Sequence, residues 1–262
     1  MTTDIETYLN SLSEDITILN ISSKSIKSLP DLTRFKNLKI LHCSNNQLTY
    51  LPTLPQNLKV LYCYNNQLTY LQSLPQNLEE LYCSHNQLTS LSSLPQNLKV
   101  LYCSNNQLTS LPTLPQQLKI LNCHNNQLTY LPTLPHNIEK LHCRNNLLTS
   151  LPILPQQLKK LDCSNNKLTS LSNLPQNLQL LFYSNNPIFE IVNSNSSNKI
   201  KQNIQILNDF RHLYYCLKFK TQFRKWLWEK VREPNIKKLY NPIYLIENLG
   251  DEDDLDAVLN NW

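Results

Sequence analysis

The sequence has 262 residues, of which 40% are hydrophobic, and its 24 Lys and Arg against 19 Asp and Glu give a formal net charge of +5. No stretch is long and apolar enough to cross a membrane, so the sequence predicts no membrane-spanning segment. A single glycine, Gly250, excludes the glycine-rich loops with which many nucleotide-binding enzymes hold phosphate groups.

The N-terminal segment, residues 1–14, is predicted to form a helical cap. Thr3 and Glu6 have the spacing of a capping box, in which each side chain bonds the backbone N–H of the other residue. The apolar residues of the segment, which share one helical face, are Ile5, Tyr8, Leu9 and Leu12. This face is expected to cover the region that follows. The segment lacks the basic start and apolar core of a secretory signal, so an intracellular location without a signal peptide is expected.

Residues 15–192 are predicted to form a solenoid of nine coils. From residue 41 to residue 180 the chain repeats one twenty-residue pattern, and residues 98–108 show its central motif, Leu-x-x-Leu-x-Cys-x-x-Asn-x-Leu. A degenerate first coil begins at Ile16, and eight further coils begin at Leu38, Leu58, Leu78, Leu98, Leu118, Ile138, Leu158 and Leu178. A fixed period of this length indicates stacked coils with a shared core. Each coil is expected to add one short parallel strand, which gives an α/β solenoid, a right-handed superhelix with a concave sheet.

The interior is predicted from residues that recur at fixed positions of the motif. Cysteines recur at Cys43, Cys63, Cys83, Cys103, Cys123, Cys143 and Cys163. Thiols stacked in parallel do not point at each other as a disulfide requires, and no Cys-x-x-Cys pair offers metal ligands, so we expect buried thiols, no metal and no cofactor. Proline-rich returns, such as residues 51–56, are expected to be extended because proline disfavours helices.

Asparagines recur three residues after the cysteines, and the last of them three residues after Tyr183, at Asn46, Asn66, Asn86, Asn106, Asn126, Asn146, Asn166 and Asn186. They are expected to form a buried ladder whose amides bond backbone groups that would otherwise be unsatisfied. Most are preceded by a second asparagine. Because the repeats contain no glycine, and asparagine tolerates the left-handed conformation better than most residues, these doublets are also expected to make the turns.

The predicted binding site is the concave face of the sheet. Side chains that flank the central Leu of each motif point to this face, because side chains alternate along a strand. The candidate partner-binding residues are His42, Val60, Tyr62, Tyr64, Tyr82, Tyr102, Lys140, His142, Arg144 and Lys160. The first six form an aromatic and aliphatic surface and the last four a basic one, and exposed tyrosines are common anchors of protein interfaces. The alternative is that the tyrosines merely pack on one another across neighbouring strands.

Residues 193–262 are predicted to form a separate α-helical module. Between residues 198 and 238 the chain carries eleven Lys and Arg but three Asp and Glu, and apolar side chains recur at helical spacing. A basic helix of this kind could bind a polyanion, such as nucleic acid, or a membrane surface. The alternative, which the sequence favours, is a solvated helix that the acidic residues between 247 and 256 partly neutralise. We therefore expect a protein partner rather than nucleic acid or a membrane.

One pair of residues has the chemistry of a nucleophilic enzyme. His212 and Cys216 are four residues apart and could share a helical face, where a neighbouring His can activate a Cys thiol. Their neighbours are apolar, and no third group is evident that would orient the His. A core cysteine is the favoured interpretation, so the sequence predicts no catalytic residue.

The repeats resemble a known family. The pattern Leu-Pro-x-Leu-Pro-x-x-Leu-x-x-Leu-x-Cys-x-x-Asn-x-Leu-Thr over residues 38–188 resembles the short, bacterial-type leucine-rich repeats of type III secreted effectors. The phrase Cys-Ser-Asn-Asn-Gln-Leu-Thr, the opening at residues 29–38 and the low Gly and Ala content are more similar to leucine-rich-repeat proteins of giant viruses that infect amoebae. Residues 240–249 and 255–262 also look like tails of such viral proteins.

The resemblance implies a non-enzymatic scaffold that binds a host or viral protein, either in the cytoplasm of an infected host or in a virion. Some secreted effectors carry a ubiquitin-ligase domain with a catalytic cysteine after the repeats, which makes an effector-like ubiquitin ligase the alternative. Residues 193–262 are too short for that domain, and Cys216 lacks the acidic and arginine companions of its motif. The identity of the partner and the oligomeric state are left open at this point.

Overall fold

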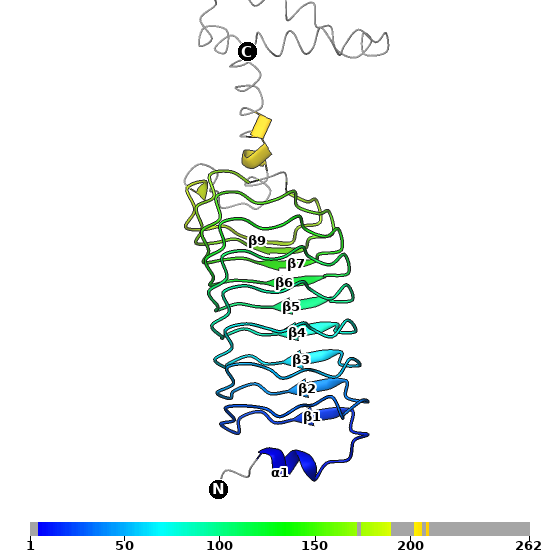
Figure 1. Ribbon diagram of the computed structural model, residues 1–262. Helices are drawn as coiled ribbons and strands as arrows, with labels where there is room; N and C mark the ends of the chain where they lie inside the picture. The colour runs from blue at the N-terminus through cyan, green and yellow to red at the C-terminus, as the bar shows by residue number, and fades with distance from the viewer. Residues whose placement is uncertain (1–4, 172–173, 190–201, 206–207, 210–262) are drawn as a thin grey trace, which may run out of the picture. The chain divides into compact units, whose positions relative to one another are not determined.

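The structure is a computed structural model that describes residues 5–171, 174–189, 202–205 and 208–209. Its elements are α1 (Ile5–Asn10), β1 (Ile18–Asn20), β2 (Ile40–His42), β3 (Val60–Tyr62), β4 (Glu80–Tyr82), β5 (Val100–Tyr102), β6 (Ile120–Asn122), β7 (Lys140–His142), β8 (Lys160–Asp162) and β9 (Leu180–Phe182). All nine strands lie in one parallel sheet in chain order. Figure 1 shows the coils stacked from β1 to β9, with α1 beside the first coil. The predicted α/β solenoid is confirmed.

The register of the sheet follows the sequence period. From β2 onward each residue pairs with the residue twenty positions later, as Leu41 does with Leu61 and Leu61 with Leu81. Leu19 of β1 pairs with Leu41, because the degenerate first coil is two residues longer. This register stacks equivalent side chains of successive coils on each other, so the interior is continuous from coil to coil.

Apolar residues of the motif fill the narrow interior. In the coil of β3, Leu61, Cys63 and Leu68 are fully buried, and Leu71 and Leu74 of the return are nearly so. Full burial of each large side chain contributes about 1.5–3 kcal/mol. Where the structure describes the return segments they contain no helix, in agreement with the extended path predicted from their prolines.

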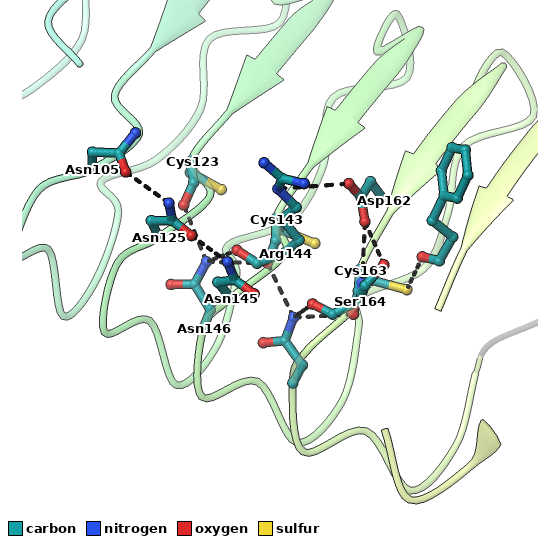
Figure 2. A network of polar contacts seen from close by, with 12 residues as sticks. Asn105, Cys123, Asn125, Cys143, Arg144, Asn145, Asn146, Asp162, Cys163 and Ser164 are labelled. Atoms are coloured by element: carbon teal, nitrogen blue, oxygen red, sulfur yellow. Dashed lines mark hydrogen bonds and ion pairs between the residues drawn. The ribbon is translucent and has the colours of Figure 1, made fainter. Parts of the chain in front are cut away.

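The predicted asparagine ladder is confirmed, and Asn146 illustrates it (Figure 2). Its Nδ2 donates to the carbonyl oxygens of Cys123 at 3.1 Å, Cys143 at 3.0 Å and Arg144 at 3.2 Å. Its Oδ1 accepts the backbone N–H of Leu128 at 3.0 Å. One amide thereby bonds its own coil and the preceding coil, and the other seven ladder asparagines do the same.

The residue before each ladder asparagine makes the turn. These residues have φ between 52° and 56°, and they are Asn45, Asn65, His85, Asn105, Asn125, Asn145, Asn165 and Asn185. The left-handed region is costly for most residues other than glycine, and asparagine tolerates it best. The side chains also bond one another, as Asn125 Nδ2 does by donating to Asn105 Oδ1 at 2.7 Å (Figure 2). The two asparagines of a doublet therefore have separate tasks.

Helix α1 covers the first coil, as predicted. Leu9 is buried in the core, and the other apolar residues of the segment pack against the core while partly exposed: Ile5, Tyr8 and Leu12. Arg34 also donates a hydrogen bond to the carbonyl oxygen of Leu9. Thr3, the predicted start of the capping box, lies outside the described residues.

The predicted C-terminal module lies almost entirely outside the described residues. Residues 202–205 are helical, and Ile204 among them is buried. In the part of the chain that the structure describes, no helix has the length and apolar character needed to cross a bilayer.

Candidate functional site

The concave face carries the side chains on either side of the central Leu of each strand. In β2 to β8 these flanking residues are half-buried while the central Leu is buried, which is the alternation predicted from the sequence. In β9 the flanking residues Leu180 and Phe182 are exposed. Every coil therefore presents equivalent positions on this face, and the residue types at these positions determine what the face can bind.

Four rings from four neighbouring strands form an aromatic stack on the concave face. The ring centroids of His42 and Tyr62 are 4.5 Å apart with planes at 4°, those of Tyr62 and Tyr82 are 4.6 Å apart at 15°, and those of Tyr82 and Tyr102 are 5.1 Å apart at 24°. The tyrosines do pack on one another, as the alternative interpretation expected. Each ring is nevertheless only half-buried, so the stack also presents a continuous aromatic surface.

The aromatic stack is bordered by aliphatic side chains and one carboxylate. Val60 and Val100 are half-buried beside it, and Tyr64 lies half-buried further along the coil of β3. Between the two valines lies Glu80, whose Oε2 accepts a hydrogen bond from the hydroxyl of Tyr82 at 2.8 Å. Burial and this carboxylate raise the pKa of Tyr82, so its hydroxyl stays protonated and remains a donor.

The other predicted residues lie together on β7, β8 and the turn after β7. We call Lys140, Arg144 and Lys160 the basic cluster. Lys140 and Lys160 are directly paired across the two strands, and the side chain of Arg144 is 49% exposed. Asp162 Oδ2 is 4.0 Å from Arg144 Nε, and Asp162 Oδ1 accepts hydrogen bonds from the hydroxyl and N–H of Ser164 at 2.7 and 3.2 Å (Figure 2). The cations of the cluster therefore outnumber the acids.

Two histidines adjoin the basic cluster. Burial lowers the pKa of His142, and the nearby Lys160, Arg144 and Lys140 act in the same direction while Asp162 opposes them. The pKa of His124 is lowered by burial first and then by the charge of Arg144.

Two side-chain polar atoms at this place lack a partner. Among the described residues, Asn122 Oδ1 and His124 Nδ1 are buried and make no hydrogen bond. Asn122 ends β6 at a position that flanks the central Leu, and His124 follows it by two residues, close enough to Arg144 and His142 for their charges to lower its pKa. The structure thus brings Asn122 and His124, which were not among the candidate residues, next to the predicted basic surface. Several other coils have Tyr and Ser at these two positions, and this difference in the sequence could have identified Asn122 and His124 as candidates.

A shallow groove along the edge where the chain enters the strands was not predicted. It has a volume of about 680 Å³, and it is lined by Asn37, Lys39, Asn57, Lys59, Asn77, Glu79, Asn97, Lys99 and Gln117. Lys59 and Lys99 both pair with Glu79, at 2.9 and 2.6 Å, and hydrogen bonds from Lys99 and then Lys59 lower the pKa of this carboxyl. Exposed pairs of this kind contribute about 0–1 kcal/mol. Lys and Asn recur every twenty residues at these positions of the sequence, and this recurrence could have predicted the groove.

Three exposed tyrosines follow the asparagine turns and were not among the candidate residues. Tyr50, Tyr70 and Tyr130 end the motif in their coils and are 40%, 49% and 57% exposed. They belong to the segment that follows the asparagine turn.

The cysteines of the repeats have no features of a reactive site. All seven are free and fully buried, as predicted. Burial raises the pKa of four of their thiols to about 12, namely Cys43, Cys83, Cys123 and Cys163. Such thiols stay protonated and are poor nucleophiles. Among the described residues, no three His, Cys, Asp or Glu gather as a metal site would require. The pair of His212 and Cys216 lies outside the described residues, and so does the basic segment at residues 198–238 apart from residues 202–205 and 208–209.

The repeats match known sequence families. The family described as Leucine Rich repeats (2 copies) matches residues 56–96, 96–136 and 136–176, and the family described as Leucine Rich Repeat matches residues 37–58. Together these matches extend over residues 37–176, more than half of the chain. A search of curated proteins finds no match.

Solved structures from bacteria are similar to the solenoid. YopM, a leucine-rich effector protein from Yersinia pestis, is 37% identical with a TM-score of 0.64, over 66% of this chain and 49% of its own. YopM from Yersinia enterocolitica WA-314 is 33% identical with a TM-score of 0.46, over 67% and 48%. A Shigella effector LRR domain is 32% identical with a TM-score of 0.50, over 68% and 74%. The chain thus spans about half the length of the two YopM structures.

Proposed function

The chain belongs to the leucine-rich-repeat family, and we propose that it is a non-enzymatic scaffold that binds another protein through the concave face of its sheet. The observation that carries this proposal is the aromatic stack. Half-buried aromatic rings with aliphatic neighbours offer a large contact area and lose little side-chain entropy on binding. A contiguous surface of this kind goes beyond the scattered apolar exposure that is normal for a protein surface.

The absence of enzymatic activity is part of the same proposal. It is supported by the raised pKa of the thiols of the repeats, which removes the most reactive side chains of the solenoid from nucleophilic chemistry. The His124 and His142 side chains lie next to cations and one paired carboxylate, a setting that fits recognition of charge.

The partner and the location are further parts of the proposal. The similar proteins from Yersinia pestis and Shigella are effectors, and this likeness supports a protein of another organism as the partner. The phrase Cys-Ser-Asn-Asn-Gln-Leu-Thr and the scarcity of Gly and Ala support a giant virus of amoebae as the source. We therefore propose a viral protein that binds a host or viral protein inside the infected cell or in the virion.

The test compares two variants that each lose three tyrosines. One carries Tyr62→Ala, Tyr82→Ala and Tyr102→Ala, and the matched control carries Tyr50→Ala, Tyr70→Ala and Tyr130→Ala, outside the strands. Proximity labelling in infected amoebae would identify the proteins that contact the full chain and each variant.

We expect the strand variant to lose the partner that the unmodified chain and the control both label. Circular dichroism and thermal melting of the purified variants establish that both remain folded. If the folded strand variant labels the same partner as the unmodified chain, the concave face is not the binding surface.

A further inference from the structure

The concave face changes character between β5 and β6. Tyr102 at the end of the aromatic stack pairs in register with Asn122, and Asn122 pairs with His142. A partner segment that crosses the strands therefore passes from an aromatic surface onto a polar, basic one. With parallel strands about 4.8 Å apart, about four to five extended residues span the distance from β5 to β8.

We propose that the basic cluster of Lys140, Arg144 and Lys160 binds an acidic, extended segment of the partner polypeptide. This proposal rests on the proposed function, because it names the chemistry of the partner at the same face. Two cations come from paired positions of β7 and β8, and the third comes from the turn after β7.

The neighbouring acids do not neutralise the cluster. Glu139 pairs with Lys159 at 2.7 Å, and a hydrogen bond from this lysine lowers the pKa of the carboxyl. Asp162 is bonded by Ser164, and its oxygen is 4.0 Å from Arg144 Nε, longer than a direct hydrogen bond. The arginine side chain, which is 49% exposed, is therefore open to a stronger bidentate carboxylate partner.

Asn122 and His124 favour a peptide over a nucleic acid. In the described structure the side chain of Asn122 has an acceptor oxygen without a partner, and His124 has an unpaired ring nitrogen. A peptide backbone offers both N–H donors and C=O acceptors, whereas a phosphate backbone offers acceptors only. A bound peptide that turns these two side chains toward itself gains hydrogen bonds that the free protein lacks.

The experiment uses the full chain and a fluorescein-labelled eight-residue peptide of alternating Glu and Ala, with binding measured by fluorescence anisotropy. The test variant carries Lys140→Glu and Arg144→Glu. The control carries Lys27→Glu and Lys167→Glu, which make the same change of net charge at exposed positions outside the strands. A peptide of alternating Lys and Ala and an oligothymidylate serve as the other two probes.

We expect the acidic peptide to bind the unmodified chain and the control, and the test variant to bind it about tenfold more weakly. The milder variant Lys140→Gln with Arg144→Gln is expected to lie between them, so the outcome does not depend on charge reversal alone. Equal weakening in test and control variants would assign the binding to net charge, and tighter binding of oligothymidylate than of the peptide would assign it to nucleic acid. Either result overturns the proposal.

The failure of this inference can be separated from failure of the proposed function. If the test variant binds the peptide normally but the three-tyrosine strand variant loses the cellular partner, the basic cluster does not bind an acidic segment. The proposal that the concave face binds a protein is then still supported. If neither variant loses the partner, the proposed interface itself is wrong.

Discussion

The two sides of each strand differ in how much they vary from coil to coil. On the inner side the central Leu and the Cys are buried in every coil from β2 to β8. The ladder asparagine recurs with the same hydrogen bonds, and it is buried in these coils except at Asn106 and Asn126, which are half-buried. On the concave side the residue after the central Leu changes from Tyr102 to Asn122, His142 and Asp162 in successive strands. The residues of the inner side are fixed by packing and hydrogen bonds that are the same in every coil, whereas the residues of the concave side are constrained mainly by solubility and binding.

This difference leads to opposite expectations for substitutions. Changes on the inner side are expected to lower stability, because they leave buried groups unpaired or unpacked in two neighbouring coils. Changes on the concave side are expected to alter binding and to affect stability less.

The ladder is tested by Asn106→Ala. Asn106 Nδ2 donates to the carbonyl oxygens of Cys83 and Cys103, both at 3.1 Å, and its Oδ1 accepts the N–H of Leu88 at 3.0 Å. Removing the amide leaves these backbone groups unpaired, so the free energy of unfolding is expected to fall by about 1–3 kcal/mol. Urea denaturation measures the loss. Gln107→Ala, at the adjacent exposed position, is expected to be neutral, and equal stability of the two variants would contradict the ladder.

The turn is tested by comparing Asn105→Ala with Asn105→Gly. Asn105 has φ of 53°, where alanine is disfavoured by the contact of its Cβ with the backbone and glycine is not. Both variants lose the side-chain bond with Asn125, so their difference isolates the backbone conformation. The Ala variant is expected to be less stable than the Gly variant by about 1 kcal/mol. A Gly variant that is the less stable of the two would show that the turn does not depend on the left-handed conformation.

The aromatic stack is tested by a double-mutant cycle on Tyr62→Ala and Tyr82→Ala. Their rings are 4.6 Å apart and nearly parallel, so a coupling energy of about 0.5–1.5 kcal/mol is expected in the free energy of unfolding. Tyr82→Phe keeps the ring and removes the hydrogen bond to Glu80, so it serves as the control for that bond. Additive single effects would mean that the rings touch without stabilising the sheet, and the concave side would then serve binding alone.

The smallest effect concerns pH and the two histidines beside the basic cluster. Burial lowers the pKa of His124 and His142 in the folded chain below the usual value of 6.5, so the unfolded chain takes up protons at a higher pH than the folded chain. The free energy of unfolding therefore decreases as the pH falls below about 6.5, until the folded histidines are themselves protonated.

His142→Asn with His124→Ser places the residues of neighbouring coils at these positions and is expected to reduce this dependence on pH. Denaturation midpoints between pH 7.5 and 5 measure it. The carboxyls of Glu79 and Glu139 have lowered pKa values, so the stability that they contribute is lost at lower pH, below their usual value of 4.5. If the variant with His142→Asn and His124→Ser depends on pH between 7.5 and 5 as the unmodified chain does, groups other than these two histidines control stability in this range.

The repeating features of this protein could all be predicted from its amino-acid sequence. The period of twenty residues determined the coils, the recurring cysteines and leucines determined the core, and the Asn doublets determined both the ladder and the turns. These predictions succeeded because each coil packs only against its neighbours, so the contacts that stabilise it are repeated in the sequence. The alternation along a strand also placed the candidate residues from His42 to Lys160 on one face.

The contacts among the side chains on that face could not be predicted in this way. The near-parallel rings from His42 to Tyr102, the carboxylate of Glu80 bonded to Tyr82, and the unpaired atoms of Asn122 and His124 depend on side-chain rotations in neighbouring coils. The groove beside Glu79 likewise needs residues from five coils at once. A repeat pattern specifies which residues become neighbours, but the torsion angles of half-buried side chains follow from local packing and charge, which become definite only when the coils stack.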